Sequence, residues 1–271
     1  MKLSNDEITF IGYGNMGSAI VEGILRDNLF KNIKIVENDK SKFNRKNQNL
    51  NFEEKITEQI SSSKYIFLCV KPQSFKTLAK QLNNKLSEDQ IIISIMAGIK
   101  IPTIENYLNH YQVVRVMPNT PAQVSKGISV WISSSKVHKS EKNTIDKILI
   151  SFGKSIEVKS EDIIDISTAL SGSGPGFIYK FLEDMILAGE KAGLDPHMSE
   201  TLAVETLIGS SELLRISKES PKRLREAVTS PGGTTEAGLN FMGKNKFENI
   251  IFGTIESAIK RSIELSKEDK L

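Results

Sequence analysis

Three glycines near the start of the chain have the spacing of a nucleotide-binding loop. Gly12, Gly14 and Gly17 follow a short apolar run and open a segment with helical spacing, in the pattern G-x-G-x-x-G. The first glycine of such a loop permits a tight turn, the second lets the backbone approach a pyrophosphate, and the third lets the helix pack closely on a sheet. Free N–H groups at the helix start attract phosphate. We therefore expect a dinucleotide in contact with Gly12, Gly14, Asn15, Met16 and Gly17.

The residues about 20 positions further on bear on the choice of coenzyme. Glu37, Asn38 and Asp39 follow the second apolar run, where folds of this kind bind the adenosine ribose. An acid there accepts hydrogen bonds from a ribose 2′-hydroxyl and repels a 2′-phosphate, which favours NAD. Lys40 and Lys42 come next and could hold a 2′-phosphate. The sequence therefore leaves NAD(H) and NADP(H) both open, and we expect both to be used.

Further loops fall at the ends of later strand-like runs. Ligands of open α/β sheets bind outside the carboxyl ends of the strands, along one shared edge. Two of these loops contain small residues and a proline that suit close approach to a dinucleotide, namely Cys69-Val70-Lys71-Pro72 and Ile95-Met96-Ala97. A third loop contains Asn119, which we expect on the nicotinamide side.

Two glycine-rich segments stand directly before helical patterns in the second half of the chain, at Ser171–Gly176 and Thr229–Thr235. Each combines hydroxyl groups with backbone N–H groups at a helix start, an arrangement that binds carboxylates. Helix capping would explain either segment alone. Two of them beside a nucleotide domain favour a site for an anionic small molecule.

The sequence offers no obvious catalytic acid. His110, His138 and His197 share neither a metal-ligand spacing nor a nearby acidic motif, and we expect no metal. Cys69 ends an apolar run and is expected to be buried and inert. A reductase without a histidine acid suits a substrate that needs little acid catalysis. An imine is such a substrate, because its protonated form is already electrophilic.

Alternating strand-like and helical patterns must position these loops in the first half of the chain. The alternation predicts an α/β fold, with an N-terminal Rossmann-type parallel sheet covered by helices. We expect strands at 8–12, 33–36, 65–70, 91–95, 113–116 and 128–132, and helices at 16–25, 74–82, 101–108 and 140–151.

The pattern changes near residue 159, after which almost no strand signal remains. Several of the later helices are apolar on more than one side, so we expect an oligomer built through this half. We predict a dinucleotide-binding domain over 1–159 and an all-helical substrate and dimerisation domain over 160–271. Its helices are expected at 167–170, 177–192, 199–216, 224–228 and 250–265.

The composition is that of an ordinary globular protein. With 271 residues, 39% of them hydrophobic and 25% charged, the chain can form one large domain or two modest ones. The net charge of the chain is only +3, and its lysines are scattered among acids. This pattern is not typical of a nucleic-acid-binding surface. Cys69 is the single cysteine, no apolar run approaches the ~20 residues of a membrane span, and Met1–Glu7 lacks a signal-peptide core. We expect a cytoplasmic protein without membrane or nucleic-acid partners.

Together, the motifs resemble those of the pyrroline-5-carboxylate reductases, which complete proline biosynthesis, and the resemblance runs over nearly the whole length. Two departures stand out. The family usually continues Gly-Pro-Ala-Tyr where this chain has Gly174-Pro175-Gly176-Phe177, and it often lacks acids where this chain has Glu37 and Asp39. The motifs are Phe10–Gly17, Cys69–Gln73, Met96–Gly98, Arg115–Pro121, Ala169–Pro175 and Val228–Thr235, of which the last is the most specific.

The resemblance implies hydride transfer from NAD(P)H to the C=N carbon of 1-pyrroline-5-carboxylate, which gives L-proline. It implies that Ser230 and backbone groups at Gly233 and Thr234, in the same loop as Gly232, hold the substrate carboxylate. The hydroxyl of Thr235 would be the catalytic group, hydrogen-bonded to the ring nitrogen. The family also implies homodimers, or rings of dimers, formed by interlocked helical domains.

Two other functions compete with this one. A β-hydroxyacid dehydrogenase has the same two-domain plan and a catalytic lysine a few residues after a glycine-rich turn, as Lys180 follows Gly176 here. That function leaves Ser230–Thr235 unexplained. A non-catalytic NAD(P)-binding sensor is a different class of protein, and the complete second glycine loop argues against it.

Overall fold

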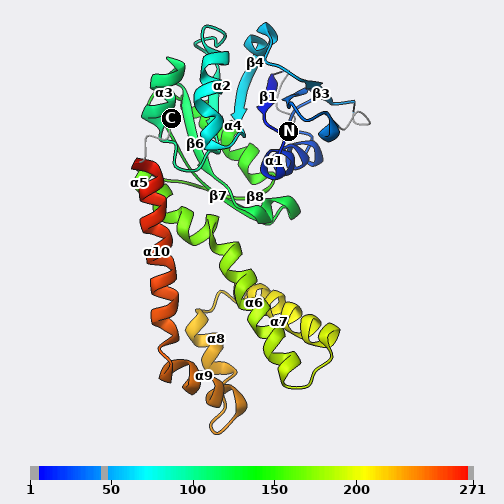
Figure 1. The fold of residues 1–271 in the computed structure, drawn as a ribbon, viewed down its shortest axis with the longest axis vertical. Coiled ribbons are helices and arrows are strands. Elements are labelled where there is room, and N and C mark those ends of the chain that lie inside the picture. Colours follow the sequence, from blue (N-terminus) through cyan, green and yellow to red (C-terminus); the bar gives the residue numbers. More distant parts are fainter. Residues whose placement is uncertain (1–5, 44–47, 268–271) are drawn as a thin grey trace. The chain divides into compact units, whose positions relative to one another are not determined.

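The computed structural model describes residues 6–43 and 48–267. Residues 1–5, which belong to the polar segment examined for a signal peptide, lie outside these ranges. By its internal contacts the chain divides into two compact units (Figure 1). The first contains Met1–Pro175 and Ala258–Leu271, and the second contains Gly176–Ser257. This division falls later in the chain than the boundary predicted after residue 159.

An eight-stranded sheet forms the first unit, in the order β3-β2-β1-β4-β5-β6-β7-β8. The strands from β3 to β6 in this order pair in parallel, whereas β7 pairs antiparallel with β6 and parallel with β8. The predicted Rossmann-type sheet is confirmed, with a reversal at β7 that the sequence did not indicate. The strands are β1 (Glu7–Ile11), β2 (Ile33–Val36), β3 (Leu50–Glu53), β4 (Ser63–Leu68), β5 (Ile91–Ser94), β6 (Val113–Met117), β7 (Gly127–Ser133) and β8 (Gly153–Glu157).

Helices cover both faces of this sheet and bury two apolar cores. In β4, Tyr65 and Phe67 point into the core beneath α1 and α4, while Ile66 and Leu68 point into the core beneath α2 and α3. A strand buried on both faces has a continuous apolar run because neither set of alternate side chains meets water. The helices are α1 (Asn15–Arg26), α2 (Phe75–Leu82), α3 (Ile101–Leu108), α4 (Lys139–Ile150) and α5 (Glu161–Ser167).

The second unit is helical. Gly193, with φ +102°, follows α6, and the Asp195 side chain caps α7 by accepting hydrogen bonds from the N–H groups of His197 and Met198. The π-helical turn η5 (Thr168–Gly172) of the first unit precedes α6. The later helices are α6 (Gly174–Lys191), α7 (Pro196–Ser217), α8 (Pro221–Ala227), α9 (Thr234–Lys244) and α10 (Phe247–Lys267), whose last part belongs to the first unit.

Large apolar side chains remain exposed on the second unit. Tyr179 is 62% exposed, Ile208 54%, Phe241 70% and Phe252 70%. The helices α6, α8 and α9 contain no buried residue. Monomeric proteins rarely expose apolar surface on this scale, so these helices need a covering partner. Within the described ranges, no helix is long and apolar enough to cross a membrane.

A buried ion cluster joins β6, α5 and the end of α10 within the first unit. Arg115 on β6 is 2% exposed and pairs with Glu161 at 3.0 Å and Asp165 at 2.7 Å. The Glu161 carboxylate also accepts from the Ile101 N–H at 3.0 Å, and the Ser266 hydroxyl donates to Asp165 at 2.9 Å. Because each buried charge has partners of opposite charge or polarity, the cluster can fix α5 and the end of α10 on the sheet.

Replacing Arg115 by methionine should leave Glu161 without its cation and Asp165 with only Lys100, at 4.0 Å. Breaking a buried pair on one side costs about 3–5 kcal/mol, so R115M should lose that much free energy of unfolding in urea titrations. The exposed pair of Lys142 and Glu157, at 2.7 Å, supplies the control. K142M should cost ~0–1 kcal/mol. Equal losses in the two variants would contradict a structural role for the cluster.

Candidate active site

The loops after β1, β2, β4 and β5 meet at one edge of the sheet. The Gly12 N–H donates to Val36 O at 2.9 Å, and the Cys69 N–H donates to Ile11 O at 2.8 Å. The Ile95 N–H donates to the end of β4 at 3.2 Å. The strand order reverses between β1 and β4, and such switch points form the ligand crevice of open α/β sheets. The structure therefore brings four of the predicted coenzyme segments together.

The three glycines of the first loop have different surroundings. A Cβ on Gly12, whose φ is +99°, would lie 2.7 Å from Cys69 O, and a Cβ on Gly17 would lie 2.7 Å from Gly12 O. These two positions need glycine because backbone approaches them closely. A Cβ on Gly14 would meet nothing within 4 Å. The open space above Gly14 is what a pyrophosphate requires.

The start of α1 offers free donors to such a group. The first backbone bond of the helix runs from the Ser18 N–H to Gly14 O, at 2.9 Å. The N–H groups of Asn15, Met16 and Gly17 precede that bond and have no intrahelical acceptor. No side chain caps the helix and its first turn holds no acid. Free donors, a positive helix end and open space together fit the pyrophosphate of NAD(P).

Glu37 ties the glycine loop to the turn after β2. Its carboxylate accepts from the Tyr13 N–H at 2.9 Å and the Asp39 N–H at 3.0 Å, and it pairs with Lys42 at 3.1 Å. Burial raises the pKa of Glu37, but these three contacts outweigh burial and hold that pKa below its usual value. The acid is therefore ionised and largely neutralised by Lys42. Asn38 and Asp39 are exposed beside it.

The two later loops differ in which atoms they can offer. Cys69 is partly rather than fully buried, and burial raises the pKa of its thiol, which favours the protonated form expected of an inert cysteine. Met96 is 2% exposed, so a ligand at this edge would meet its backbone rather than its side chain. Lys71 and Ala97 are exposed, while Val70, Pro72 and Ile95 are partly buried.

Asn119 has an internal role that the sequence did not reveal. Its amide nitrogen donates to Ser171 O at 3.1 Å, and its amide oxygen accepts from the Ile128 N–H at 2.9 Å. The side chain is 8% exposed and holds the first glycine-rich segment against β7. Its predicted contact with the nicotinamide stays a prediction.

The second glycine loop ends at the start of α9. Gly233 is the N-cap of that helix, with no side-chain cap, and its N–H donates to Ser230 O at 3.0 Å. That N–H is already used inside the turn, so it is not the free donor to the substrate carboxylate that the resemblance implies at Gly233. The next backbone donors, on Thr234 and Thr235, belong to the first turn of α9 and have no intrahelical acceptor. These donors, with the exposed Ser230 and Thr235 side chains, are the groups this loop can offer a carboxylate.

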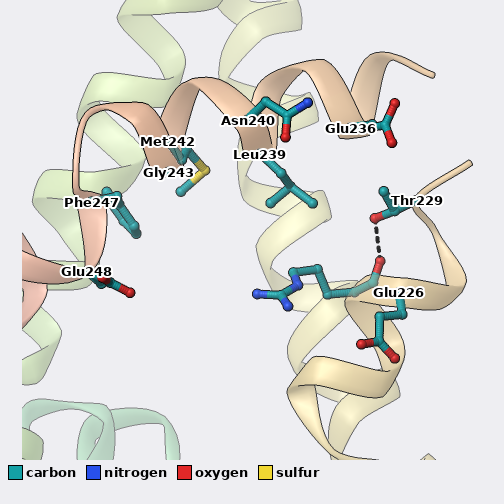
Figure 2. Close-up of a pocket in the computed structure, with 10 residues that line it drawn as sticks. Glu226, Thr229, Glu236, Leu239, Asn240, Met242, Gly243, Phe247 and Glu248 are labelled. Carbon is teal, nitrogen blue, oxygen red and sulfur yellow. Dashed lines mark hydrogen bonds between the residues drawn. The ribbon is translucent and has the colours of Figure 1, made fainter. Parts of the chain in front are cut away.

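A cavity of ≈500 Å³ lies beside this loop, within the second unit (Figure 2). Three acids, Glu226, Glu236 and Glu248, line it together with one cation, Arg225, and with neutral polar and apolar residues. Residues 230–235 are absent from its lining. Because three acids outnumber the one cation, Arg225, the cavity disfavours an anionic substrate, and we expect the substrate carboxylate at the helix start instead.

The residues that would support other chemistry are engaged elsewhere. Lys180 is exposed on α6, and hydrogen bonds to Asp184 and Glu183, at 2.8 and 3.2 Å, raise its pKa. His110 is buried, with its ring hydrogen-bonded to Gln90 O at 2.7 Å. Among the residues that the structure describes, no three His, Cys, Asp or Glu form a group that could hold a metal ion.

Comparisons with known proteins give a consistent result. The model of pyrroline-5-carboxylate reductase dimerisation matches residues 161–265, and the model of NADP oxidoreductase, coenzyme F420-dependent, matches residues 7–98. The chain is 32% identical to a pyrroline-5-carboxylate reductase of Staphylococcus saprophyticus, over 97% of this chain and 99% of that one. It is 33% identical to pyrroline-5-carboxylate reductase 2 of Bacillus subtilis, over 97% and 96% of the two chains.

Two solved structures are similar over nearly their whole length. The pyrroline-5-carboxylate reductase of Coxiella burnetii has a TM-score of 0.90 and 32% identity, over 97% of this chain and 100% of that one. The pyrroline carboxylate reductase of Plasmodium falciparum, solved with NADP bound, has a TM-score of 0.87 and 32% identity, over 98% and 100%.

Valine at position 14 should abolish coenzyme binding without unfolding the protein. Gly14 has an ordinary φ of −81° and open space around a Cβ, so G14V should fold but fill the pyrophosphate position. We expect NADPH affinity, measured by calorimetry, to fall on the order of 100-fold, about 2.8 kcal/mol. G12A should instead lower the melting temperature, because its Cβ meets backbone. Undiminished NADPH affinity in folded G14V would place the coenzyme elsewhere.

Serine at position 37 should change coenzyme preference. The Glu37 carboxylate repels a 2′-phosphate, although its pairing with Lys42 already weakens this repulsion. Without the carboxylate, the ratio of kcat/KM for NADPH to kcat/KM for NADH should rise about fivefold. Both KM values should also rise, because the Tyr13 N–H loses its acceptor. E157S is the control, since Glu157 is an exposed acid on β8 that pairs with Lys142, away from the loops after β1 and β2. An unaltered ratio in E37S would remove Glu37 from the ribose site.

Proposed function

The chain belongs to the pyrroline-5-carboxylate reductase family, and from this we propose that it reduces 1-pyrroline-5-carboxylate to L-proline at the expense of NADPH or NADH. It is an NAD(P)H-dependent oxidoreductase that acts on a C=N bond. The reaction is the final step of proline biosynthesis. One observation carries the proposal most directly. Two helices, α1 and α9, begin after glycine loops without a side-chain cap, and each offers free N–H groups to an anion.

The first of these helix starts would hold the coenzyme. The N–H groups of Asn15, Met16 and Gly17 bind the pyrophosphate, and Glu37 keeps the loop in place through the Tyr13 N–H. Asn38, Asp39, Lys40 and Lys42 lie where the adenosine ribose and any 2′-phosphate bind. When bound, the reduced nicotinamide supplies the hydride for the C=N carbon. In this proposal the loops at 69–72 and 95–97 flank the coenzyme, and Asn119 lies on the nicotinamide side.

The second helix start would hold the substrate. The Thr234 and Thr235 N–H groups and the Ser230 hydroxyl bind the substrate carboxylate, while Gly232 and Gly233 let the backbone turn into α9. The Thr235 hydroxyl hydrogen-bonds the ring nitrogen and so orients and polarises the imine. It need not be a strong acid, because the protonated imine is already electrophilic. The protein thus contributes position and the exclusion of water.

The helical half would also build the assembly. We propose a dinucleotide-binding domain over 1–159 and a helical substrate and dimerisation domain over 160–271, joined into homodimers or a ring of dimers. The exposed side chains of α6, α7, α9 and α10 support this, because a second copy would cover them. We place the enzyme in the cytoplasm, with no metal, membrane or nucleic-acid partner.

Turnover of the imine tests the function. Purified protein should oxidise NADPH or NADH only when pyrroline-5-carboxylate is present, followed as loss of absorbance. Oxidation of a 3-hydroxy acid instead would favour the dehydrogenase alternative. Tight coenzyme binding without turnover of either compound would favour the sensor alternative.

Alanine at position 235 should slow the reaction without abolishing it. Removing a hydrogen bond that the bound substrate would shield from water costs ~1–3 kcal/mol, so kcat/KM for the imine should fall roughly 5- to 150-fold. NADPH affinity should be unchanged, since the coenzyme groups lie in the other unit. T235S should recover much of the rate because it restores the hydroxyl.

T234A is the matched control, since we expect Thr234 to act through its backbone. A normal rate in T235A with a slow T234A would assign the hydroxyl to the wrong threonine. Normal rates in both would reduce the loop to a helix cap.

The native species should be a dimer or larger. Light scattering at micromolar concentration should give a mass at least twice the 30.1 kDa of the chain. Phe241 is exposed on α9. The variant F241R should shift the protein toward smaller species, because burying a charge in the interface between copies is costly. A 30.1 kDa particle for the unaltered chain would contradict the assembly.

A further inference from the structure

The side chain of Glu236 reaches back from the first turn of α9 to the loop that precedes it. Its carboxylate accepts a hydrogen bond from the Gly232 N–H at 2.8 Å. Glu236 is partly buried and lines the ≈500 Å³ cavity. In Figure 2 it lies with Thr229 at one end of that cavity, while Phe247 and Glu248 lie at the other.

The rest of the loop has few internal bonds. At its start, the Thr229 hydroxyl donates to Arg225 O at 2.6 Å, which fastens Thr229 to α8. At its end, the Gly233 N–H donates to Ser230 O at 3.0 Å. Between them stand Pro231, which has no N–H, and Gly232, whose φ of +72° few other residues adopt. The carboxylate of Glu236 therefore joins the most flexible residue of the loop to the rigid start of α9.

The order of this loop bears on substrate binding. The Gly233 N–H is already donated within the turn, which leaves the first donors of α9 and the Ser230 hydroxyl for a substrate carboxylate. Those groups converge only while the Ser230–Gly233 turn keeps its shape. A loop of glycine and proline that is loose in the free protein must be ordered when the substrate binds, and this ordering weakens binding.

We propose that Glu236 is a positioning residue for the substrate: by accepting from the Gly232 N–H it holds the loop in its binding shape before the imine arrives. The proposal rests on the function proposed above for this loop. Glu236 does not bind the substrate itself, because both carry a carboxylate and would repel each other. What matters is the reach and acceptor oxygen of its side chain rather than its charge.

Two substitutions separate reach from charge. E236Q keeps a side-chain oxygen at the same distance but is neutral, whereas E236D keeps the charge on a chain that is one methylene shorter. E236Q should retain a KM for the imine within about twofold of the unaltered protein. E236D and E236A should raise that KM roughly tenfold, with kcat and the KM for NADPH unchanged.

Glu248 supplies the matched control. It is an acid in the first turn of α10, lines the same cavity and lies at its far end. E248A should leave the KM for the imine unchanged. A second readout needs no substrate: hydrogen exchange at the Gly232 amide should be faster in E236A and E236D than in E236Q or E248A.

The outcomes distinguish the proposal from its alternatives. A tenfold rise in KM for E236Q with a normal E236D would assign the effect to charge at the helix end and overturn the proposal. Normal KM values and normal Gly232 exchange in E236A would also overturn it. If the unaltered protein did not reduce the imine, the proposed function would be wrong. Fast hydrogen exchange at Gly232 in E236A would then still show that Glu236 orders the loop.

Discussion

The close approach of the Gly12 backbone to the Cys69 carbonyl is the constraint on which the coenzyme site depends. Only a residue without a side chain fits there, since a Cβ would lie 2.7 Å from that oxygen. The approach sets the ends of β1 and β4 side by side, where the strand order reverses. At that edge, the start of α1, the turn at Glu37 and the later loops can all contact one ligand. Replacing Gly12 would therefore disturb all of these segments together.

At both glycine loops the nearby acid is engaged, whereas the first backbone donors of the helix that follows have no intrahelical acceptor. Glu37 pairs with Lys42, and Glu236 accepts a hydrogen bond from the Gly232 N–H. What remains available to a dianionic pyrophosphate or a carboxylate is the positive end of α1 or of α9. This suits a protein with a formal net charge of only +3, which cannot rely on long-range attraction.

Sequence reasoning found the parts of the fold whose signal is local. The six predicted strands are short segments rich in apolar residues, and the loop Gly12–Gly17 has its own glycine spacing. The strands β3 and β8 were missed because they lie at the edges of the sheet and bury few side chains. The reversal of β7 has no local signature, because an antiparallel strand can have the same apolar pattern as a parallel one.

The side-chain contacts of the site were harder to foresee. Asn119 bonds Ser171, 52 residues away, and no periodicity reports a pair so distant. Glu37 was read as a ribose ligand from its position, whereas the structure adds its bonds to Tyr13 and Asp39. Glu236 is the one such residue that a local signal could have revealed. An acid three residues after a helix N-cap commonly reaches back to a preceding backbone N–H.

The fate of the hydride decides whether this protein reduces the imine with its coenzyme. The protein can be given the imine with NADPH in which both hydrogens at C4 of the nicotinamide are deuterium, and the product examined by mass spectrometry and NMR. We expect L-proline with one deuterium, on the ring carbon that is bonded to nitrogen and does not carry the carboxylate. Coenzyme oxidation without deuterium in that position, or no L-proline at all, would contradict this expectation.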